Sequence, residues 1–375
     1  MRRNSGLFPQ LLTWPNLLFA ARGASRRKRH RRVVQRFEFF REFELLQLFR
    51  ELLDDSYRPG PFLTHWIRRP KKRLISAAPY RDRVIHHAIM NVLEPILEQR
   101  FHPHSFACRK GKGTHAASRH FQRLLRRHRY TLQMDLRKYF PSIDHEILKA
   151  RFRKVLKDRQ FLVLLDRIVD GSNLQEMVQE HYPGDDLFTP CERRKGLPIG
   201  NLTSQWFANW YLDPLDHWLT NRMQIGGYVR YCDDFILCDD DRGKLQAMMD
   251  MVPEFLNGLR VKIHEERLAI LPAKAGRVFV GYRTFPSHRL ITADNKRRFL
   301  RRLRWMKRAF AQGRITSEVI HQRLMSWIGH AGQSDSLPLV QKLSEDWVWI
   351  DGRFSHFRST ASTRPCSDFR QPPTC

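Results

Sequence analysis

Two adjacent aspartates within a run of strand-forming residues constrain this chain more than any other sequence feature. Residues 228–237 read Tyr-Val-Arg-Tyr-Cys-Asp-Asp-Phe-Ile-Leu, and most of them are apolar or aromatic residues that favour strands. Burying Asp233 and Asp234 inside a sheet would cost free energy, so we expect the pair at the tip of a β-hairpin. Such a pair is either an ordinary surface turn or a set of oxygen ligands for a hard cation.

A third carboxylate favours the cation site. Asp135 lies near the end of an alternating stretch, residues 130–136, that predicts a strand. In an α/β domain with an antiparallel sheet this strand and the hairpin can be neighbours, which would bring three carboxylates together. They would repel one another unless cations neutralised them. Two Mg²⁺ ions about 4 Å apart do this and form the apparatus for in-line attack on a phosphate, with Mn²⁺ as the expected substitute.

The charge of the chain points to a polyanionic partner. The 375 residues contain 67 Lys and Arg against 38 Asp and Glu, a formal net charge of +29. Nucleic acid is the first candidate. An anionic membrane surface is the alternative, but no basic amphipathic helix with a clean apolar face stands out near a terminus; nor does any apolar run approach the ~20 residues of a membrane span. The six cysteines are scattered without a Cys-x-x-Cys pair, so we expect free thiols in a reducing, cytoplasmic compartment.

Hydrophobic periodicity predicts the elements around these acids. Helices are expected over 33–54, 114–128, 206–218 and 243–257, and after residue 292 over 295–312, 316–329 and 336–349. Two further helices are expected to begin at capping residues, Asp82 and Asp144. A hairpin is expected over 62–80, and strands over 259–263, 267–271 and 277–282. Residues 1–36 are strongly basic and are expected to be a solvated or disordered arm, or one that contacts phosphates.

The motifs resemble those of reverse transcriptases, in the expected order over about residues 35–290. Leu-Gln-Met-Asp-Leu-Arg-Lys-Tyr-Phe-Pro-Ser-Ile-Asp at 132–144 is similar to the first catalytic motif of that family, and Tyr-Cys-Asp-Asp at 231–234 to its Tyr-x-Asp-Asp motif. Gly-Leu-Pro-Ile-Gly-Asn-Leu-Thr-Ser-Gln at 196–205 sits where the family places a loop that contacts template and nucleotide, and Val-Gly-Tyr at 280–282 resembles the primer-grip turn.

The resemblance implies a right-hand polymerase, an α/β (α+β) fold with fingers, palm and helical thumb. The implied parts are a basic N-terminal arm at 1–34, fingers at 35–128, a palm at 129–290 with room for fingers insertions within 158–195, a thumb at 291–350 and a disordered tail at 351–375. It also implies template RNA, an RNA/DNA duplex and deoxynucleoside triphosphates as partners, and no membrane.

The resemblance further implies roles for single residues. The metal ligands would be Asp135, Asp233, Asp234 and the Leu136 carbonyl; the nucleotide would meet Arg73, Arg81, Phe140, Ile199, Gly200, Gln205 and Arg267; and Gly281 and Tyr282 would form the primer grip. A ring at Phe140, the sugar-gate position, would collide with a ribose 2′-hydroxyl and select deoxynucleotides. Arg73 and Arg81 are alternatively surface arginines of a basic protein. Arg267 stands where the family has a lysine, and an arginine does not readily give up a proton.

The middle motif narrows the resemblance. Many reverse transcriptases carry Gln-Gly and later Ser-Pro there, whereas this chain has Ile199-Gly200 and Ser204-Gln205. This pattern resembles the enzymes of diversity-generating retroelements, which copy a template RNA into cDNA with errors at adenines and work with a small basic accessory protein. The alternatives are a reverse transcriptase of group II intron, retron or phage-defence type, and a non-catalytic RNA-binding protein on a polymerase scaffold.

Overall fold

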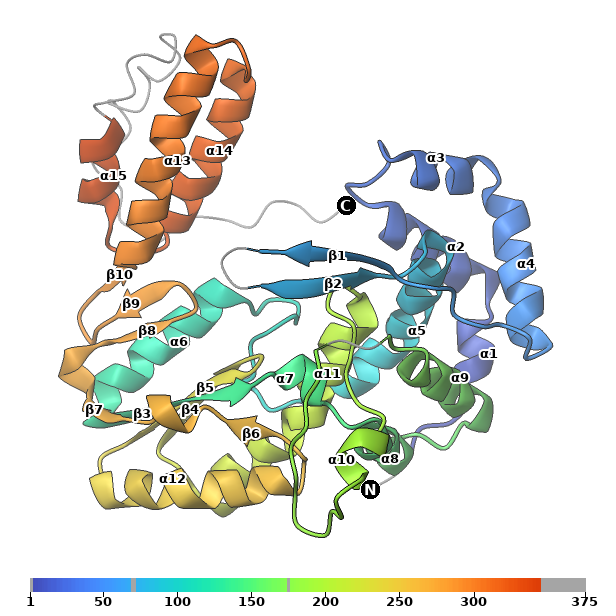
Figure 1. Ribbon diagram of the computed structural model, residues 1–375, viewed down its shortest axis with the longest axis horizontal. Coiled ribbons are helices and arrows are strands. Elements are labelled where there is room, and N and C mark those ends of the chain that lie inside the picture. The colour runs from blue at the N-terminus through green and yellow to red at the C-terminus, as the bar shows by residue number, and fades with distance from the viewer. Residues whose placement is uncertain (1–2, 69–71, 174–175, 345–375) are drawn as a thin grey trace. The chain divides into compact units, whose positions relative to one another are not determined.

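The computed structural model describes residues 3–68, 72–173 and 176–344, and the chain divides into two compact units. The first runs from the N-terminus to Ala275 and the second from Gly276 onward (Figure 1). Each unit is described by itself. Within the described residues, no helix combines the length and the apolar character that crossing a membrane requires.

The N-terminal segment is folded, which corrects the expectation of a solvated arm. Helices α1 (Leu7–Leu11) and α2 (Trp14–Ser25) lie before the basic residues 26–32, and α2 packs along α5 (Tyr80–Glu98). Leu11 and Leu17 are fully buried in the main core. Periodic apolar residues in this segment therefore outweigh its charge, while the arginines between 26 and 32 remain exposed.

The helix expected over 33–54 is two helices. α3 (Arg32–Phe39) and α4 (Arg41–Leu53) meet at Phe40, whose φ of −101° and ψ of 24° interrupt the helical hydrogen bonding. The predicted hairpin is confirmed as β1 (Leu63–Ile67) paired antiparallel with β2 (Arg73–Ala77). The following helix begins after Pro79, not at Asp82, because the Asp82 carboxylate accepts hydrogen bonds from Tyr57 and Gly60 instead.

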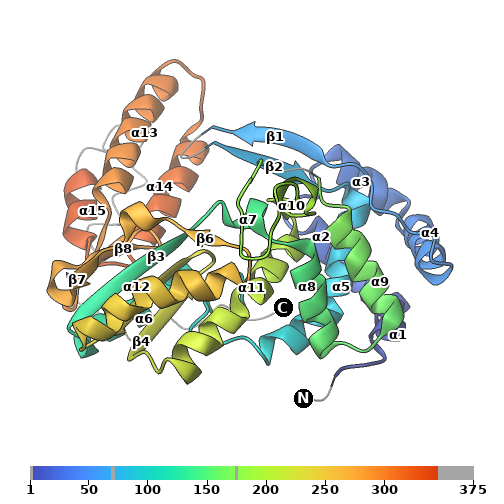
Figure 2. The same cartoon turned by 60° about the horizontal axis from the view of Figure 1, so that its bottom comes forward.

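A five-stranded sheet forms the centre of the first unit. Its order is β4-β5-β3-β6, with β7 also paired to β3, and all pairings are antiparallel. The strands are β3 (Tyr130–Arg137), β4 (Gly227–Tyr231), β5 (Asp234–Asp239), β6 (Lys262–Ile263) and β7 (Ile270–Pro272). Helix α12 (Arg242–Asn257) lies across one face of this sheet (Figure 2), and it continues through Pro253. α6 (Thr114–Arg127) packs on β4.

Helices between β3 and β4 complete the first unit. They are α7 (Tyr139–Ser142), α8 (His145–Val155), α9 (Arg159–Asp170), α10 (Thr189–Glu192) and α11 (Leu202–His217). The predicted cap is confirmed, since the Asp144 carboxylate accepts from the Ile147 N–H at 3.0 Å. α11 begins four residues earlier than expected and continues into a π-helical turn, Trp218–Arg222.

As far as Ser344, where the described residues end, the second unit joins a small sheet to three helices. Strands β8 (Arg277–Phe279), β9 (Tyr282–Thr284) and β10 (Arg289–Ile291) pair in the order β10-β9-β8. The strand expected over 277–282 is broken because Val280 and Gly281, with φ of 44° and 88°, form a tight turn. The three predicted helices are α13 (Ala293–Ala311), α14 (Ser317–Ala331) and α15 (Leu337–Ser344). The tail expected to be disordered, residues 351–375, lies outside the described residues.

Candidate active site

Strand register brings two of the predicted acids opposite each other. β3 and β5 pair so that Asp135 faces Asp234, and Leu136 N–H donates to the Asp233 carbonyl at 3.2 Å. Tyr231 and Asp234 close the β4–β5 hairpin, so Cys232 and Asp233 form its turn. The hairpin predicted from the sequence is confirmed. Its tip lies beside the end of β3, where the third acid was expected.

The acids are oxygen donors of the kind that hard cations take. Asp135, Asp233 and Asp234 are all partly exposed. Asp234 Oδ1 accepts a hydrogen bond from Gln133 Nε2 at 2.8 Å, two residues before Asp135 on the same strand face. Among the residues that the structure describes, no three His, Cys, Asp or Glu side chains are arranged to hold a metal ion. The expected cluster is therefore seen only as an in-register pair with its neighbour in the turn.

The loop of the middle motif is attached by its backbone to two other parts of the candidate site. Leu197 N–H donates to the Phe140 carbonyl at 2.9 Å, directly after the strand that carries Asp135. On its other side, the Ile199 carbonyl accepts from Ser76 N–H at 2.9 Å, in the strand that begins at Arg73. The loop thus joins two predicted nucleotide residues, Ile199 and Phe140, to the strand that begins at Arg73.

Asn201 and Gly200 fix the end of this loop. The buried Asn201 amide accepts from Ala78 N–H at 3.1 Å and donates to the Ser76 carbonyl at 3.1 Å. This one side chain therefore ties the loop to β2 and to the residue that follows it. Gly200 has φ of 121°, and a Cβ there would lie 3.1 Å from Cγ2 of Ile75. Glycine is required here by both its conformation and its close approach to β2. Asn201 was not predicted as a site residue, although it lies within the motif.

The remaining predicted nucleotide residues are less closely grouped. Arg73 is exposed at the start of β2, and Gln205 is exposed on the first turn of α11. Arg81 forms an ion pair with Glu51 of α4. Arg267 ends a short 3₁₀ turn, Glu265–Arg267, and its side chain lies outside the described part of the structure.

The predicted primer-grip residues belong to the second unit. Gly281 is exposed in the tight turn between β8 and β9. Tyr282 is fully buried, and its hydroxyl lies 2.9 Å from Nδ1 of His330 on α14 and donates to the His330 carbonyl at 3.0 Å. Burial raises the pKa of Tyr282 to about 12. Tyr282 therefore ties the small sheet to a helix of its own unit.

Comparison with known proteins decides the family. The family described as reverse transcriptase (RNA-dependent DNA polymerase) matches residues 67–284, more than half of the chain. The chain belongs to the reverse transcriptase family. Its right-hand polymerase fold and its reaction class, RNA-directed DNA polymerisation, follow from that membership.

Curated relatives of this reverse transcriptase come from intron-encoded and bacterial proteins. Protein YkfC of Escherichia coli is 25% identical over 64% of this chain and 70% of its own length. The group II intron-encoded protein LtrA of Lactococcus lactis is 26% identical over 47% of this chain, and a putative COX1/OXI3 intron 1 protein of Saccharomyces cerevisiae is 22% identical over 60%. The matches span 28% and 25% of those last two relatives, so the chain corresponds to only part of their length.

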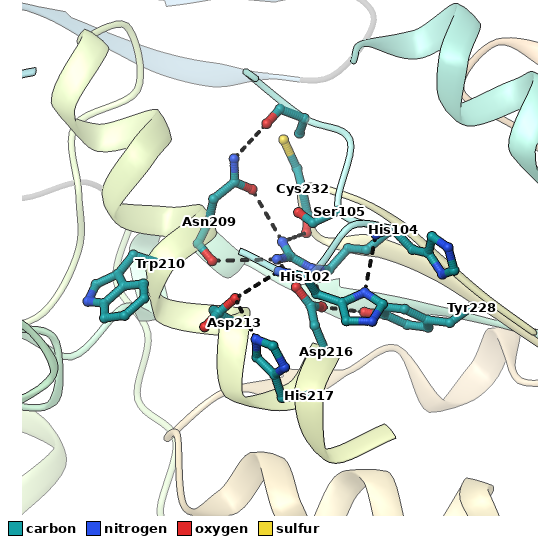
Figure 3. Close-up of polar contacts among 12 residues, drawn as sticks. His102, His104, Ser105, Asn209, Trp210, Asp213, Asp216, His217, Tyr228 and Cys232 are labelled. Carbon is teal, nitrogen blue, oxygen red and sulfur yellow. Dashed lines mark hydrogen bonds and ion pairs between the residues drawn. The ribbon is translucent and has the colours of Figure 1, made fainter. Parts of the chain in front are cut away.

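A buried ion pair joins the β4–β5 hairpin of this reverse transcriptase to helix α11. Arg230 on β4 is 0% exposed, and its Nε and Nη2 donate to the two carboxylate oxygens of Asp216 on α11 at 2.6 and 2.5 Å. Its Nη1 donates to the Cys232 carbonyl at 3.0 Å and to Oδ1 of Asn209 at 3.2 Å. Figure 3 shows Asn209, Asp216, Tyr228 and Cys232, with dashed lines for the hydrogen bonds and ion pairs of this group.

The sequence prediction missed this pair, although a signal was present. Arg230 stands in a strand that reads as otherwise apolar or aromatic, and a buried arginine needs an acid partner. Two candidate acids, Asp213 and Asp216, lie on the aromatic helix that precedes the hairpin. Burial by itself lowers the pKa of Arg230, but the Asp216 carboxylate outweighs it and the net shift is upward. The Asp216 carboxylate thus stabilises the charged form of Arg230.

Neutral histidines surround the ion pair. Burial lowers the pKa of His102 and of His120 to about 4. His120 Nε2 lies 3.1 Å from the Tyr228 carbonyl, and His102 N–H donates to Asp213 at 3.3 Å. Burial, with the negative charge of Asp216, raises the pKa of Asp213 to about 6. These histidines and Asp213 therefore lie in a partly to fully buried region beside the Arg230–Asp216 pair.

Proposed function

We propose that this RNA-directed DNA polymerase makes adenine-error-prone cDNA from a template RNA in a diversity-generating retroelement. The observation that carries the proposal is the place of Ile199 and Gly200. Their loop is hydrogen-bonded both to the strand of Arg73 and to the backbone of Phe140. An apolar side chain at 199 would then lie against the nascent base pair.

The proposed chemistry uses two Mg²⁺ ions. Asp135, Asp233 and Asp234, with the Leu136 carbonyl, would hold them. When bound, the ions make the primer 3′-hydroxyl a better nucleophile and stabilise the leaving pyrophosphate. The strand register supports this assignment because it places Asp135 opposite Asp234, next to the turn that contains Asp233. Mn²⁺ would substitute, since it takes the same oxygen ligands.

The proposed nucleotide pocket lies between the β4–β5 hairpin and β2. Phe140 would exclude a ribose 2′-hydroxyl, and Gly200 would let the backbone approach the nucleotide. Arg73 and Arg81 would hold the triphosphate with paired N–H groups; Arg81 would first have to leave Glu51. Gln205 would contact the template side, and Arg267 the leaving phosphate without acting as a proton donor.

The error-prone step follows from what Ile199 cannot do. An aliphatic side chain offers no hydrogen bond to the nascent pair, so selection that depends on such a bond is weakened. The Ile199→Gln variant should therefore copy template adenines more accurately. The measurement is sequencing of cDNA made by both enzymes on one defined RNA.

The sequencing experiment has two controls. Asp233→Asn should abolish primer extension, and equal extension by this variant and the wild type would refute the metal assignment. Errors at template uridines serve as the internal reference, because the argument concerns adenines. An unchanged adenine error rate in Ile199→Gln would remove the support for the retroelement assignment and leave the polymerase assignment intact.

A group II intron-type reverse transcriptase is the second candidate. The similarity to LtrA and to yeast and plant intron proteins favours it. The two candidates differ in fidelity, so cDNA with few and evenly distributed errors would favour the intron type. Retron and phage-defence enzymes also extend primers, so the distribution of errors, not extension itself, is the test for them. Primer extension tests the non-catalytic RNA-binding alternative.

Partners and parts follow from the proposal. The polymerase would bind a template RNA and an RNA/DNA duplex in the reducing cytoplasm and work with a small basic accessory protein. The fingers would include the β1–β2 hairpin, the palm the five-stranded sheet, and the thumb helices α13, α14 and α15. The Gly281–Tyr282 turn would be the primer grip, and it belongs to the unit that carries these helices.

A further inference from the structure

The side chain of Arg230 is the largest fully buried side chain of the described structure. Each nitrogen of its guanidinium donates a hydrogen bond. Its carboxylate partner, Asp216, is also 0% exposed and accepts a third hydrogen bond from the Tyr228 hydroxyl at 2.5 Å. Taking two charges out of water is costly, and an apolar pair of similar volume is often as stable. Stability alone is therefore a weak reason for placing an arginine at this position.

The third branch of the guanidinium indicates what the arginine does. Nη1 donates to the Cys232 carbonyl at 3.0 Å, and that carbonyl belongs to the peptide group that continues into Asp233. Cys232 adopts φ of 57°, a left-handed conformation that a residue with a side chain rarely adopts. A hydrogen bond from a fixed donor holds this peptide plane. The orientation of the plane sets the direction in which the Asp233 backbone leaves the turn.

The donor is fixed because its surroundings are fixed. Asn209, which accepts from Nη1 through Oδ1, donates through Nδ2 to the Ala107 carbonyl at 2.7 Å. The backbone of Arg230 itself donates to the His104 carbonyl and accepts from Phe106 N–H, both at 2.9 Å. Strand, helix and loop thus hold the guanidinium in one place. Arginine suits this task because its planar fork binds a carboxylate and a carbonyl at once, which a lysine ammonium does not reproduce.

We propose that Arg230, anchored by Asp216 and Asn209, is a positioning residue that sets the catalytic turn through the Cys232 carbonyl. The inference rests on the proposed metal-binding role of Asp233 and Asp234. Arg230 touches neither substrate nor metal. It acts by holding the two carboxylates in the geometry that the metal ions require.

The test separates positioning from packing. Arg230→Met/Asp216→Asn removes both charges together, so no unpaired buried charge remains and the Tyr228 hydroxyl keeps an acceptor. We expect this double variant to fold with a lowered melting temperature, because the Cys232 carbonyl and Asn209 Oδ1 lose the Arg230 donor, and to bind a fluorescent template–primer with unchanged Kd. We expect its kcat to fall by about 10- to 100-fold, as for a small misplacement of reacting groups, and the Mg²⁺ concentration for half-maximal rate to rise. Arg230→Lys should recover part of the kcat.

The outcomes are distinct. A folded double variant with wild-type kcat and wild-type Mg²⁺ dependence overturns the positioning role. If the double variant does not fold, Arg230→Lys decides alone: lower kcat with a raised Mg²⁺ requirement supports the role, and wild-type values overturn it. Asp233→Asn distinguishes failure of the underlying function. If Asp233→Asn extends primers as the wild type does, the metal assignment falls; if it is inactive while the double variant is fully active, only the role of Arg230 falls.

Discussion

At the scale of single residues, Phe140 carries the prediction on sugar selection. Its ring is partly buried against the main core, and its carbonyl holds the loop of Ile199. Phe140→Ala keeps the carbonyl and removes the ring, so incorporation of ribonucleotides should rise by roughly 10- to 100-fold relative to deoxynucleotides. Competitive primer extension with both nucleotide types measures the ratio.

A matched control uses a ring that does not face the proposed pocket. Tyr139, the neighbour of Phe140, is buried, and its hydroxyl donates to the Ala208 carbonyl at 2.5 Å. Tyr139→Phe should leave sugar selection unchanged. Equal ribonucleotide discrimination by Phe140→Ala and the wild type would show that another residue is the sugar gate.

Residue-level prediction from the sequence succeeded where register decides the outcome. Asp135 lies opposite Asp234 because alternation and the turn fix the pairing of the two strands. Prediction failed where the decision depends on distant side chains. The Asp82 carboxylate bonds to Tyr57 rather than capping its helix, and the partner of Arg230 lies on a preceding helix. Local patterns contain no information on which of several acids a buried group will meet.

At the scale of elements, the loop at 196–201 is predicted to depend on one glycine. Gly200→Ala places a Cβ 3.1 Å from Ile75 and imposes a left-handed φ on an alanine. We expect weaker nucleotide binding, seen as a several-fold rise in KM for deoxynucleotides, with the melting temperature lowered only modestly because Asn201 still bridges β2.

The control is a glycine in open space. Gly111 also has a positive φ, of 69°, but no atom lies within 4 Å of a Cβ placed there. Gly111→Ala therefore also places an alanine at positive φ, with milder strain because 69° lies in the ordinary left-handed region, and without the close approach to β2. A similar KM effect in both variants would assign it to global strain and not to the loop.

The boundaries of the helices and strands show why the sequence predicts the type of an element more reliably than the residues at which it begins and ends. The apolar period continues through Phe40, yet the chain breaks there into α3 and α4. The strand-like run at 277–282 splits at Val280-Gly281 because both residues adopt positive φ. Helix α11 starts at Leu202 because Asn201 already bonds to β2. In each case tertiary contacts or a turn, which periodicity does not encode, set the boundary.

At the scale of the whole molecule, the charge of +29 predicts strongly salt-dependent binding of nucleic acid. If ~6–10 phosphates are contacted, affinity for a template–primer duplex should fall by about 10³- to 10⁵-fold between 50 and 200 mM salt. Arg297, Arg301 and Arg304 recur along exposed positions of α13. Replacing Arg297 and Arg301 by glutamine should reduce the salt slope by about one for each phosphate that an arginine no longer neutralises.

Binding titrations at several salt concentrations measure both effects. The control is Arg153→Gln, because Arg153 is already paired with Asp166. A flat salt dependence of the wild type would contradict binding through phosphates. An unchanged slope in the α13 variant would move the duplex-binding site to another part of the basic surface.

Buried histidines predict loss of stability in acid. Burial lowers the pKa of His86 to about 3, and that of His102 and His120 to about 4. In the unfolded chain each would take up a proton near pH 6.5, so the unfolded state binds more protons between that pH and about 4, and the free energy of unfolding falls as pH falls. Asp213, with its pKa raised to about 6, works in the opposite direction between about pH 6 and 4.

Burial also raises the pKa of Asp82, so two aspartates oppose these three histidines, and the balance is a net loss of stability in acid. Chemical denaturation at pH 7, 6, 5 and 4 measures it, and His86→Leu should flatten the slope because it removes the proton-binding difference. His181 is exposed, so His181→Gln is the matched control. A wild-type stability that rises steadily from pH 7 to 4 would contradict this reading of the buried groups.

The loop of the middle motif also affects how such a polymerase can evolve. Its attachments to β2 and to Phe140 use backbone groups and the Asn201 amide, and none of these hydrogen bonds uses the side chain of residue 199. That position can therefore change without loss of these hydrogen bonds. On the proposed role of Ile199, copying accuracy and folding would be under separate selection, and a lineage would move between faithful and mutagenic copying by one substitution.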